Sequence, residues 1–496
     1  MRRKQSRSLP FALVLLGGIV LCPFRGAGSQ EIQLSSPRGI KEVCRILPPI
    51  PHGSYSEKDQ KKAQDLCSID FYDDSKVALC PKTWSTSPAT MVYQISEKGL
   101  RQLEYESRSN CGGAKAGHET LAKFKQSMNQ KGTSGTYSPS SLLYYHFSRF
   151  FNMTLDVPVA VYRSMDRFSH FERVTKKSHQ KSMGKSAQNR AGWKWLYQAE
   201  LNPTIYIPKS DLFVEGDEQI FGVLLKGSGT RYGLEINGIR SKWGEVQNLE
   251  FQETPAFLAL RSGQPLEQAI QDGLAQGLKN RRMKLAMGGD VSVFQMALWM
   301  KELSEIVLLD YIFNQQDRIG NIDYKWRTYW VGEDGKAFHK KINSSLPRTA
   351  FGRVESLAKV DGVRSYLVQK TSINDNDAGG RGPGHRGGSY VNFAKKTRML
   401  ENVRHIDPET YKKLIQLNLD FESRGEIYQY LEREFRLDPK DIKSIVSNTS
   451  QAAHVLRQAC ADGLLHFDLD SPSALLRGGI GSISNRDSQP INCAAP

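Results

Sequence analysis

The chain has 496 residues, of which 39% are hydrophobic and 24% are charged. This composition predicts a folded protein with a sizeable core and excludes a wholly disordered chain. No apolar run reaches the roughly 18 residues of a membrane-spanning helix, which excludes a multi-pass membrane protein. Lys and Arg number 68 and Asp and Glu 52, so the formal net charge is +16. A charge of this size makes nucleic-acid binding a hypothesis to be tested.

The first 29 residues have the three parts of a secretory signal peptide. Four basic residues precede an apolar run from Phe11 to Cys22, and small residues follow it as far as Ser29. This pattern predicts a signal peptide over residues 1–29. We therefore expect a protein that is secreted, periplasmic or lumenal in the secretory pathway, with no integral membrane span in the mature chain. Cleavage removes five basic residues and no acidic one, which reduces the net charge to +11.

Much of the remaining positive charge lies in one polar segment, residues 163–194. This segment contains nine Lys and Arg residues against Asp166 and Glu172, a local net charge of +7, and the rest of the mature chain is close to balanced. A nucleic-acid partner is therefore not expected. An acidic partner, such as a polyanionic glycan bound through residues 163–194, is an alternative that stays open.

The cysteines agree with export. Of seven cysteines, Cys22 leaves with the signal peptide, and the other six predict disulfide bonds in an oxidising compartment. Six cysteines allow about fifteen pairings, so the spacing alone does not give the connectivity. We expect one bond between Cys460 and Cys493, because it would hold down a polar C-terminal tail rich in Gly and Ser.

The first half of the mature chain is expected to be rich in strands. Residues 30–88 are polar, rich in Pro and contain three cysteines, which predicts an irregular, disulfide-containing extension. Residues 89–226 follow, with a helix over 140–151 that Ser138 and Pro139 open and a basic insertion at 163–195. The strands predicted in this part are residues 91–95, 102–107, 120–125 and 220–225.

Residues 227–468 are expected to be mostly helical. Apolar residues from Ser292 to Phe313 recur at three- and four-residue steps, which predicts a long amphipathic helix. Residues 364–369 resemble a strand, residues 396–465 again favour helix, and residues 469–496 form a tail. Strands that precede helices in this way predict an α+β protein with two lobes.

Three places contain residues suited to chemistry. Lys125 lies on the predicted strand at 120–125, where a lysine that faces a cleft can pair with nucleotide phosphates, although most strand lysines are simply exposed. Asp317 and Asn321 follow the long helix. A carboxylate there can accept a proton from a hydroxyl, and an amide oxygen can bind a metal, although a polar turn is the simpler interpretation.

The third place is the acidic segment Ile373-Asn-Asp-Asn-Asp-Ala-Gly. Asp375 and Asp377 are hard oxygen ligands suited to Mg²⁺ or Mn²⁺, and the alternative is an acidic turn. A glycine-rich stretch follows, in which Arg381, His385 and Arg386 could contact an anionic substrate or face solvent. The chain has no Gly-x-x-x-x-Gly-Lys-Ser/Thr loop, no His-Glu-x-x-His and no Gly-x-Ser-x-Gly motif.

Five segments, taken in chain order, are similar to motifs of one kinase family. A strand lysine, a helix, an apolar strand, a long helix, an Asp loop and an acidic loop follow one another. In this order the chain resembles the secretory-pathway kinases of the Golgi casein kinase family, and more distantly the bacterial HipA-type kinases, over roughly residues 90–425. The similar segments are Phe124-Lys125-Gln126, Leu143–Phe151 with Val157-Pro-Val-Ala, Asp217–Leu225, Asp310–Arg318 and Ile373–Gly379.

The resemblance implies a protein-kinase-like fold with a small β-rich N-lobe and a mostly helical C-lobe, and an enzyme that uses ATP with Mg²⁺ or Mn²⁺. It implies that Lys125 binds the ATP phosphates, that Asp317 is the catalytic base, and that one or both of Asp375 and Asp377, with Asn321, bind the metal. The acceptor would be a hydroxyl of a protein or a glycan. The helix glutamate that pairs with the ATP lysine in this family falls near Ser141 in this sequence.

Two alternatives to an active kinase follow from the same residues. The loss of the glutamate at Ser141 suggests a secreted pseudokinase that acts as a binding or activating partner. The charge of residues 163–194 suggests instead a secreted basic protein that binds acidic glycans or other polyanions, for which Asp317 would be irrelevant.

Overall fold

The structure is a computed structural model. It describes residues 29–95, 101–107, 111, 119–180, 186–214, 216–227, 229–288, 291–342, 365–382, 390–470, 476 and 491–493. The predicted signal peptide therefore lies almost wholly outside the described residues. His385 and Arg386 also lie outside them.

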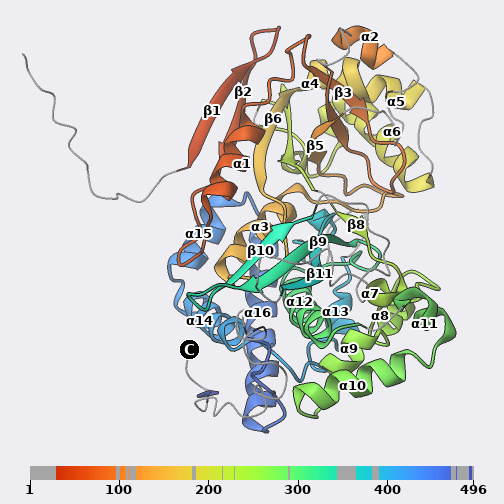
Figure 1. The fold of residues 1–496 in the computed structure, drawn as a ribbon. Helices are drawn as coiled ribbons and strands as arrows, with labels where there is room; N and C mark the ends of the chain where they lie inside the picture. The colour runs from red at the N-terminus through yellow and green to blue at the C-terminus, as the bar shows by residue number, and fades with distance from the viewer. Residues whose placement is uncertain are drawn as a thin grey trace, which may run out of the picture.

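The N-terminal part of the chain is built around a seven-stranded antiparallel sheet (Figure 1). The strand order is β1-β2-β6-β7-β5-β4-β3, so β7 and β5 are central. Both are short apolar segments that the sequence predicts as strands, and their inner residues are buried. The strands are β1 Gln30–Ser35, β2 Lys41–Ile46, β3 Val77–Pro81, β4 Thr90–Gln94, β5 Thr120–Gln126, β6 Ala160–Asp166 and β7 Gln219–Leu225.

The segment expected to be an irregular extension is largely ordered and belongs to this sheet. Residues 30–88 form β1, β2 and β3 together with helix α1, Glu57–Cys67. Two of the pairings are local, β1 with β2 and β3 with β4, and the polar, Pro-rich composition hides them. The pairing of β2 with β6 spans a long sequence distance, which no local pattern predicts. Arg163 of β6, for example, is fully buried and forms an ion pair with Glu42 of β2 at 3.1 Å.

Residues 102–107 are helical, and the predicted strand is wrong. The alternating sequence Gln-Leu-Glu-Tyr-Glu-Ser forms α2, Gln102–Ser107, which buries Gln102 and Tyr105 on one side. The Gln102 side-chain amide donates hydrogen bonds to the backbone oxygens of Phe71 at 3.1 Å and Val77 at 2.7 Å. These bonds dock the short helix against β3, because the spacing of three residues places its buried side chains on one face.

The basic segment 163–194 begins inside β6 and continues as a group of helices beside the sheet (Figure 1). Several of its cations have intramolecular partners. Arg173 pairs with buried Glu106 at 2.7 Å and Lys176 with Glu172 at 2.9 Å. Part of the positive charge of this segment is thus neutralised by ion pairs within the protein. The helical elements are α4 Arg167–His170, a π-helix Phe171–Thr175, α5 Lys176–Gln180 and α6 Ala187–Leu201.

The C-terminal part is mostly helical and carries a smaller antiparallel sheet at its upper edge (Figure 1). That sheet has the order β10-β9-β11, with β8 also paired to β9. Its strands are β8 Thr230–Arg231, β9 Ile322–Val331, β10 Ala337–Lys341 and β11 Ser365–Ile373. The helices are α7 Leu234–Asn237, α8 Glu245–Phe251, α9 Pro255–Leu260, α10 Leu266–Gly277, α11 Arg281–Met287, α12 Val293–Ile312, α13 Phe393–Lys396, α14 Pro408–Ser423, α15 Glu426–Glu434 and α16 Pro439–Ala461. The chain is thus an α+β protein, as predicted.

Helix α12 is the centre of the C-terminal core. Ser292 caps it by accepting a hydrogen bond from the Gln295 backbone, which confirms the predicted start of the helix. It is not amphipathic, however, because every residue from Phe294 to Ile312 is buried. Neighbouring elements, among them α9, α16 and β11, pack around it. A helix enclosed on all sides holds the loop that follows it in a fixed position.

Helix α3, Ser138–Phe150, lies between the two sheets (Figure 1). It contacts β6 and β7 on one side and α12 on the other, and nearly all of its residues are buried. Pro139 occupies its first turn, as predicted, but the capping position is Tyr137 and makes no side-chain hydrogen bond. The N-terminus of α3 is held instead by the acidic segment after β11.

Three disulfides connect the six cysteines of the described residues: Cys44–Cys67, Cys80–Cys111 and Cys460–Cys493. The predicted bond between Cys460 and Cys493 is confirmed. Disulfides persist in oxidising compartments, so an extracellular or lumenal location follows. Among the described residues, no helix is long and apolar enough to cross a membrane.

The bond between Cys44 and Cys67 joins β2 to α1 and closes a loop of 23 residues. We expect a variant with both cysteines replaced by alanine to lose about 2–4 kcal/mol of unfolding free energy, because the open loop gains entropy when it unfolds. Denaturant unfolding at constant pH measures this. Replacing Cys460 and Cys493 provides the comparison, and an unchanged midpoint in the Cys44/Cys67 variant would contradict the expectation.

Candidate functional site

Lys125 lies near the C-terminal end of β5, at the centre of the large sheet. Its side chain is only 2% exposed. The ammonium group forms ion pairs with two carboxylates, Asp375 Oδ1 at 2.7 Å and Asp377 Oδ1 at 2.5 Å. Lys125 thus contacts two other residues singled out in the sequence, of which Asp375 lies 250 positions further along the chain.

The acidic segment that supplies these carboxylates is fixed against the start of α3. The backbone N–H of Tyr137 donates to the Asp377 carbonyl at 2.7 Å, and the Ser140 hydroxyl donates to the Asn376 carbonyl at 2.6 Å. Asp375 adopts a left-handed conformation with φ of 52°. Such a conformation is strained for a residue other than glycine and is held by the surrounding contacts.

The charges of Lys125 and Asp375 strongly affect each other's pKa values. Burial by itself lowers the pKa of the Lys125 ammonium, but Asp375 and Asp377 outweigh it and raise that pKa above its ordinary value. In turn Lys125 lowers the pKa of Asp375 well below its usual range, against the effect of burial. Lys125 is thus held charged between the two carboxylates.

A further lysine borders the cluster and was not found from the sequence. Lys82 is 5% exposed, and burial lowers its pKa to about 8, with Asp375 acting in the opposite direction. It follows β3, where neither periodicity nor a motif distinguishes it from an ordinary surface lysine. Only the pairing of β3 with β4 and β4 with β5 brings it near Lys125.

Asp317 lies in the loop directly after α12, as predicted. Its Oδ1 accepts a hydrogen bond from Trp243 Nε1 at 3.1 Å, and its backbone N–H donates to Gln315 Oε1 at 3.1 Å. Burial raises the pKa of the Asp317 carboxyl, and the negative charges of Asp375 and Asp377 raise it further, while the Trp243 hydrogen bond lowers it. Asp317 is thus near the Lys125 cluster and is a stronger base than an exposed aspartate.

Two contacts connect the Asp317 loop to the acidic segment. Arg318 donates three hydrogen bonds to Asp310 of α12, at 2.9 to 3.2 Å, and its Nη1 donates to the Asn374 carbonyl at 3.2 Å. The backbone N–H of Gln316 donates to the Ala378 carbonyl at 3.1 Å. The two loops therefore form one unit anchored on α12.

The side-chain amide of Asn321 is hydrogen-bonded to two other residues, and its oxygen is not left open to a metal ion. Its amide oxygen accepts a hydrogen bond from Arg231 Nη1 at 2.8 Å, and its amide nitrogen donates to the Asp317 carbonyl at 2.7 Å. In this arrangement Asn321 fixes the position of Asp317. Its role as a metal ligand stays a prediction, and would require Arg231 to move.

Arg381 is structural rather than available to substrate. Its side chain is fully buried. The guanidinium forms an ion pair with Asp211 and stacks over the ring of Tyr137 at 4.0 Å. The expectation that Arg381 contacts an anionic substrate or faces solvent is wrong, because its side chain is enclosed and the backbone N–H of the next residue, Gly382, donates to Asp441 at 2.8 Å.

Several buried polar atoms on β5, on α3, in the loop after α12 and in the acidic segment have no hydrogen-bond partner in the described part of the chain. Buried polar groups are otherwise almost always paired. Gln126 directly follows Lys125 on β5, so its side chain points to the opposite face of the sheet. The atoms are Gln126 Oε1 and Nε2, Ser141 Oγ, Gln315 Nε2 and Asn376 Oδ1.

No group of three or more His, Cys, Asp or Glu side chains in the described part of the chain is arranged to hold a metal on its own. Asp375 and Asp377 are two carboxylates, which suits Mg²⁺ or Mn²⁺ bound jointly with substrate phosphates and water. Comparison with protein-family models and with curated proteins finds no match for this chain.

Proposed function

We propose that this chain is a phosphotransferase of protein-kinase-like fold that moves the γ-phosphoryl group of ATP to a hydroxyl of a protein or a glycan. The observation that carries the proposal is the contact of Lys125 with Asp375 and Asp377, next to the anchored loop of Asp317. The order β5, α3, β7, α12, Asp317 loop and acidic segment supports it, because each element occurs where the resemblance implies.

Each residue has a defined task in this proposal. Lys125 would hold the α- and β-phosphates, and Asp375 and Asp377 would hold Mg²⁺ or Mn²⁺, which would neutralise charge that develops on the γ-phosphoryl group. Asp317 accepts the proton of the acceptor hydroxyl while the oxygen of that hydroxyl forms a bond to the γ-phosphorus. The bond from that phosphorus to the bridging oxygen breaks, and ADP leaves.

The absence of the helix glutamate supports a second candidate, a pseudokinase. Ser141 is buried, and its hydroxyl has no hydrogen-bond partner in the described part of the chain. Lys125 is held by Asp375 and Asp377 instead. A site in which the lysine is paired this way can bind a nucleotide and still fail to transfer phosphate.

The deciding experiment uses the purified mature chain, produced in an oxidising compartment so that its disulfides form. It is given ATP labelled at the γ-position with Mn²⁺ and with casein or proteoglycan-type glycans as acceptors. Transfer of label supports the enzyme. Thermal stabilisation by ATP without any transfer supports the pseudokinase, because a ligand that binds the folded state stabilises it.

The pH dependence gives a sharper prediction. The pKa of Asp317 is raised, so the acid limb of kcat/KM should lie above the 3.8 of an ordinary aspartate. Trp243→Phe removes a hydrogen bond that lowers this pKa, so the limb should move to still higher pH. Trp330→Phe, on β9, is the control. A profile that Trp243→Phe leaves unchanged would show that Asp317 is not the titrating base.

A further inference from the structure

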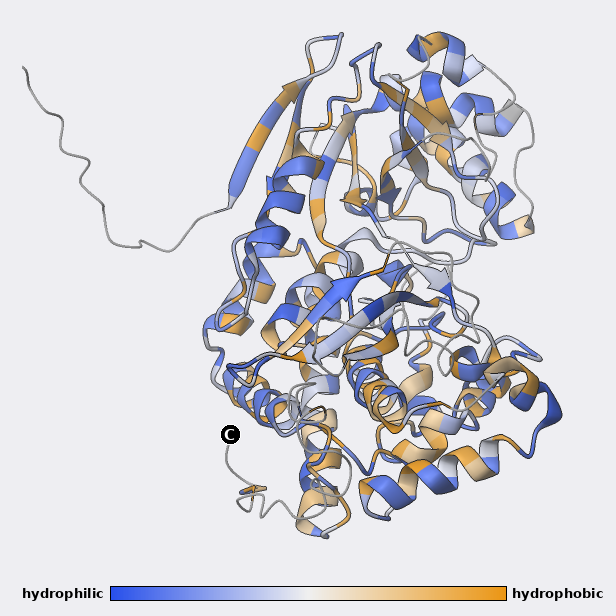
Figure 2. Ribbon diagram, in the orientation of Figure 1, coloured by the Kyte–Doolittle hydropathy of each residue, from blue (hydrophilic) through white to orange (hydrophobic). Residues whose placement is uncertain are grey.

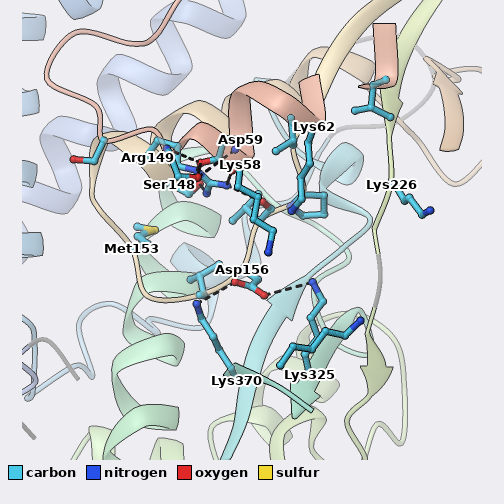
Figure 3. A pocket seen from close by; sticks show the side chains of 18 of the residues that line it. Lys58, Asp59, Lys62, Ser148, Arg149, Met153, Asp156, Lys226, Lys325 and Lys370 are labelled. Carbon is cyan, nitrogen blue, oxygen red and sulfur yellow. Dashed lines mark hydrogen bonds and ion pairs between the residues drawn. The ribbon is translucent and has the colours of Figure 1, made fainter. Parts of the chain in front are cut away.

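A second site lies away from the Lys125 cluster. A cavity of about 650 Å³ opens between α1, the loop after α3, and strands β9, β10 and β11. Figure 3 shows Lys58 and Lys62 extending from α1 toward Asp156, with Lys325 and Lys370 on the opposite wall. None of Lys125, Asp317, Asp375 and Asp377 lines this cavity.

The cavity wall is strongly basic. Its lining includes eight Lys and Arg residues and three Asp residues, so it contributes a net charge of +5. Helix α1, the source of two of these lysines, is hydrophilic along most of its length (Figure 2). The cations are Lys58, Lys62, Arg149, Lys226, Lys325, Arg327, Lys341 and Lys370, and the carboxylates are Asp59, Asp65 and Asp156.

The carboxylates neutralise only part of this charge. Asp59 accepts two hydrogen bonds from Arg149, from Nη2 at 2.9 Å and from Nε at 3.1 Å. Asp156 is shared by three cations, Lys370 at 3.0 Å, Lys325 at 3.4 Å and Arg327 at 3.6 Å. One carboxylate against three cations leaves an excess of two positive charges at the floor of the cavity.

The floor is also rigid. The Asp156 backbone exchanges hydrogen bonds with β11, donating to the Thr371 carbonyl at 2.8 Å and accepting from Ile373 at 3.0 Å. Arg327 and Lys370 are each at most 9% exposed. Their charges are therefore held in place at low dielectric, where they interact with an anion more strongly than exposed lysines do.

The pKa shifts of two side chains in the cavity agree with an excess of positive charge there. Partial burial of the otherwise exposed Lys62 lowers its pKa, and repulsion from Lys58 and Lys325 lowers it further. Burial also lowers the pKa of His339 to about 4, with Lys370 and Arg327 adding to the effect. At neutral pH, His339 is thus an uncharged hydrogen-bonding group beside mutually repelling cations.

The shape indicates what kind of anion fits. The cavity is of the size that encloses a small organic ligand, and part of its wall is apolar, with Leu66, Leu121 and Val157 among the lining residues. Lysines outnumber arginines six to two, and lysine acts as a point charge toward phosphate or sulfate. We propose that this cavity binds a small organic polyanion, about the size of a disaccharide, that carries several sulfate or phosphate groups.

The test removes rim charges without touching the buried floor. Lys58, Lys62 and Lys341 are exposed, so a variant with Gln at all three should fold. The matched control replaces Lys76, Lys336 and Lys396, which form exposed ion pairs of little energetic worth elsewhere on the surface. Both variants lose three charges, and their melting temperatures should stay close to that of the unmodified chain.

Binding is measured by calorimetry with sucrose octasulfate, inositol hexakisphosphate and unmodified sucrose at physiological salt. We expect one or both polyanions to bind and sucrose not to bind. The rim variant should weaken binding about tenfold or more, and the control variant by less than about threefold. Preference for one polyanion identifies sulfate or phosphate as the source. Failure of both to bind, or equal weakening by the two variants, would overturn the proposal.

This site is independent of the proposed phosphotransferase. The variant Asp317→Asn should bind the same polyanion with unchanged affinity, because Asp317 does not line the cavity. An affinity that falls with Asp317→Asn would show that the probe occupies the Lys125 site instead, and would overturn the assignment to this cavity.

Discussion

Replacing Asp317 with Asn is expected to reduce the rate of phosphoryl transfer by about 100- to 10,000-fold. Asn keeps the shape of the side chain and can still accept the hydrogen bond from Trp243 Nε1. It cannot take a proton from a hydroxyl. ATP binding should be nearly unchanged, because Asp317 is not among the residues that contact Lys125. The expected signature is therefore a loss in kcat, measured by transfer of labelled phosphate.

The control for this variant is Asp323→Asn. Asp323 is buried and lies on β9, where it pairs with Arg231 at 2.6 Å and accepts a hydrogen bond from Asn374 at 2.7 Å. Its replacement should lower stability somewhat and affect the rate by less than about tenfold. Full activity in Asp317→Asn together with a large loss in Asp323→Asn would assign the base to Asp323 instead.

Replacing Lys125 with Met should destabilise the protein and abolish transfer. Without the ammonium, Asp377 at 3% exposure and the neighbouring Asp375 face each other unpaired. Removing one partner of a buried ion pair costs about 3–5 kcal/mol, which denaturant unfolding can measure. The same substitution at Lys123, which is less buried on the same strand, should cost much less. The double variant Lys125→Met with Asp377→Asn should recover part of the stability.

The pH dependence of this loss has a defined sign. The pKa of Asp375 is lowered in the folded state, so its ion pair contributes stability that is present above about pH 4 and is lost as the pH falls through the folded pKa. The difference between Lys125→Met and the unmodified chain should therefore be largest near neutral pH and shrink in acid. A constant difference across this range would show that packing of the lysine stem, and not its charge, causes the loss.

Elements with strong local patterns were predictable from the sequence. Strands β4, β5 and β7 and helices α3 and α12 lie within a few residues of their predicted positions, because short apolar runs and capping residues mark them. The strands β1 and β2 were not predicted. Strand β1 pairs with β2 in a local hairpin, and β2 joins the sheet through β6, more than a hundred residues away. The polar, Pro-rich composition of this segment hides the hairpin, and no local pattern encodes the pairing with β6.

The residues of the candidate site likewise fall into those that the sequence identified and those that it did not. Lys125, Asp317, Asp375 and Asp377 were identified from the sequence because each belongs to a short segment with a recognisable order. Trp243 and Lys82 were not identified, although both act on the pKa values of the site. Each reaches the site only through tertiary packing, and an isolated Trp or Lys in a sequence gives no indication of it.

The double ion pair of Lys125 has a consequence for how ligands would bind. A phosphate chain must draw the ammonium away from Asp375 and Asp377, and a divalent ion must displace it from the same two carboxylates. Either ligand alone would bear the whole cost of breaking these contacts. The second would bind to a site already opened, so nucleotide and metal should show positive cooperativity, each raising the affinity of the other by the same factor.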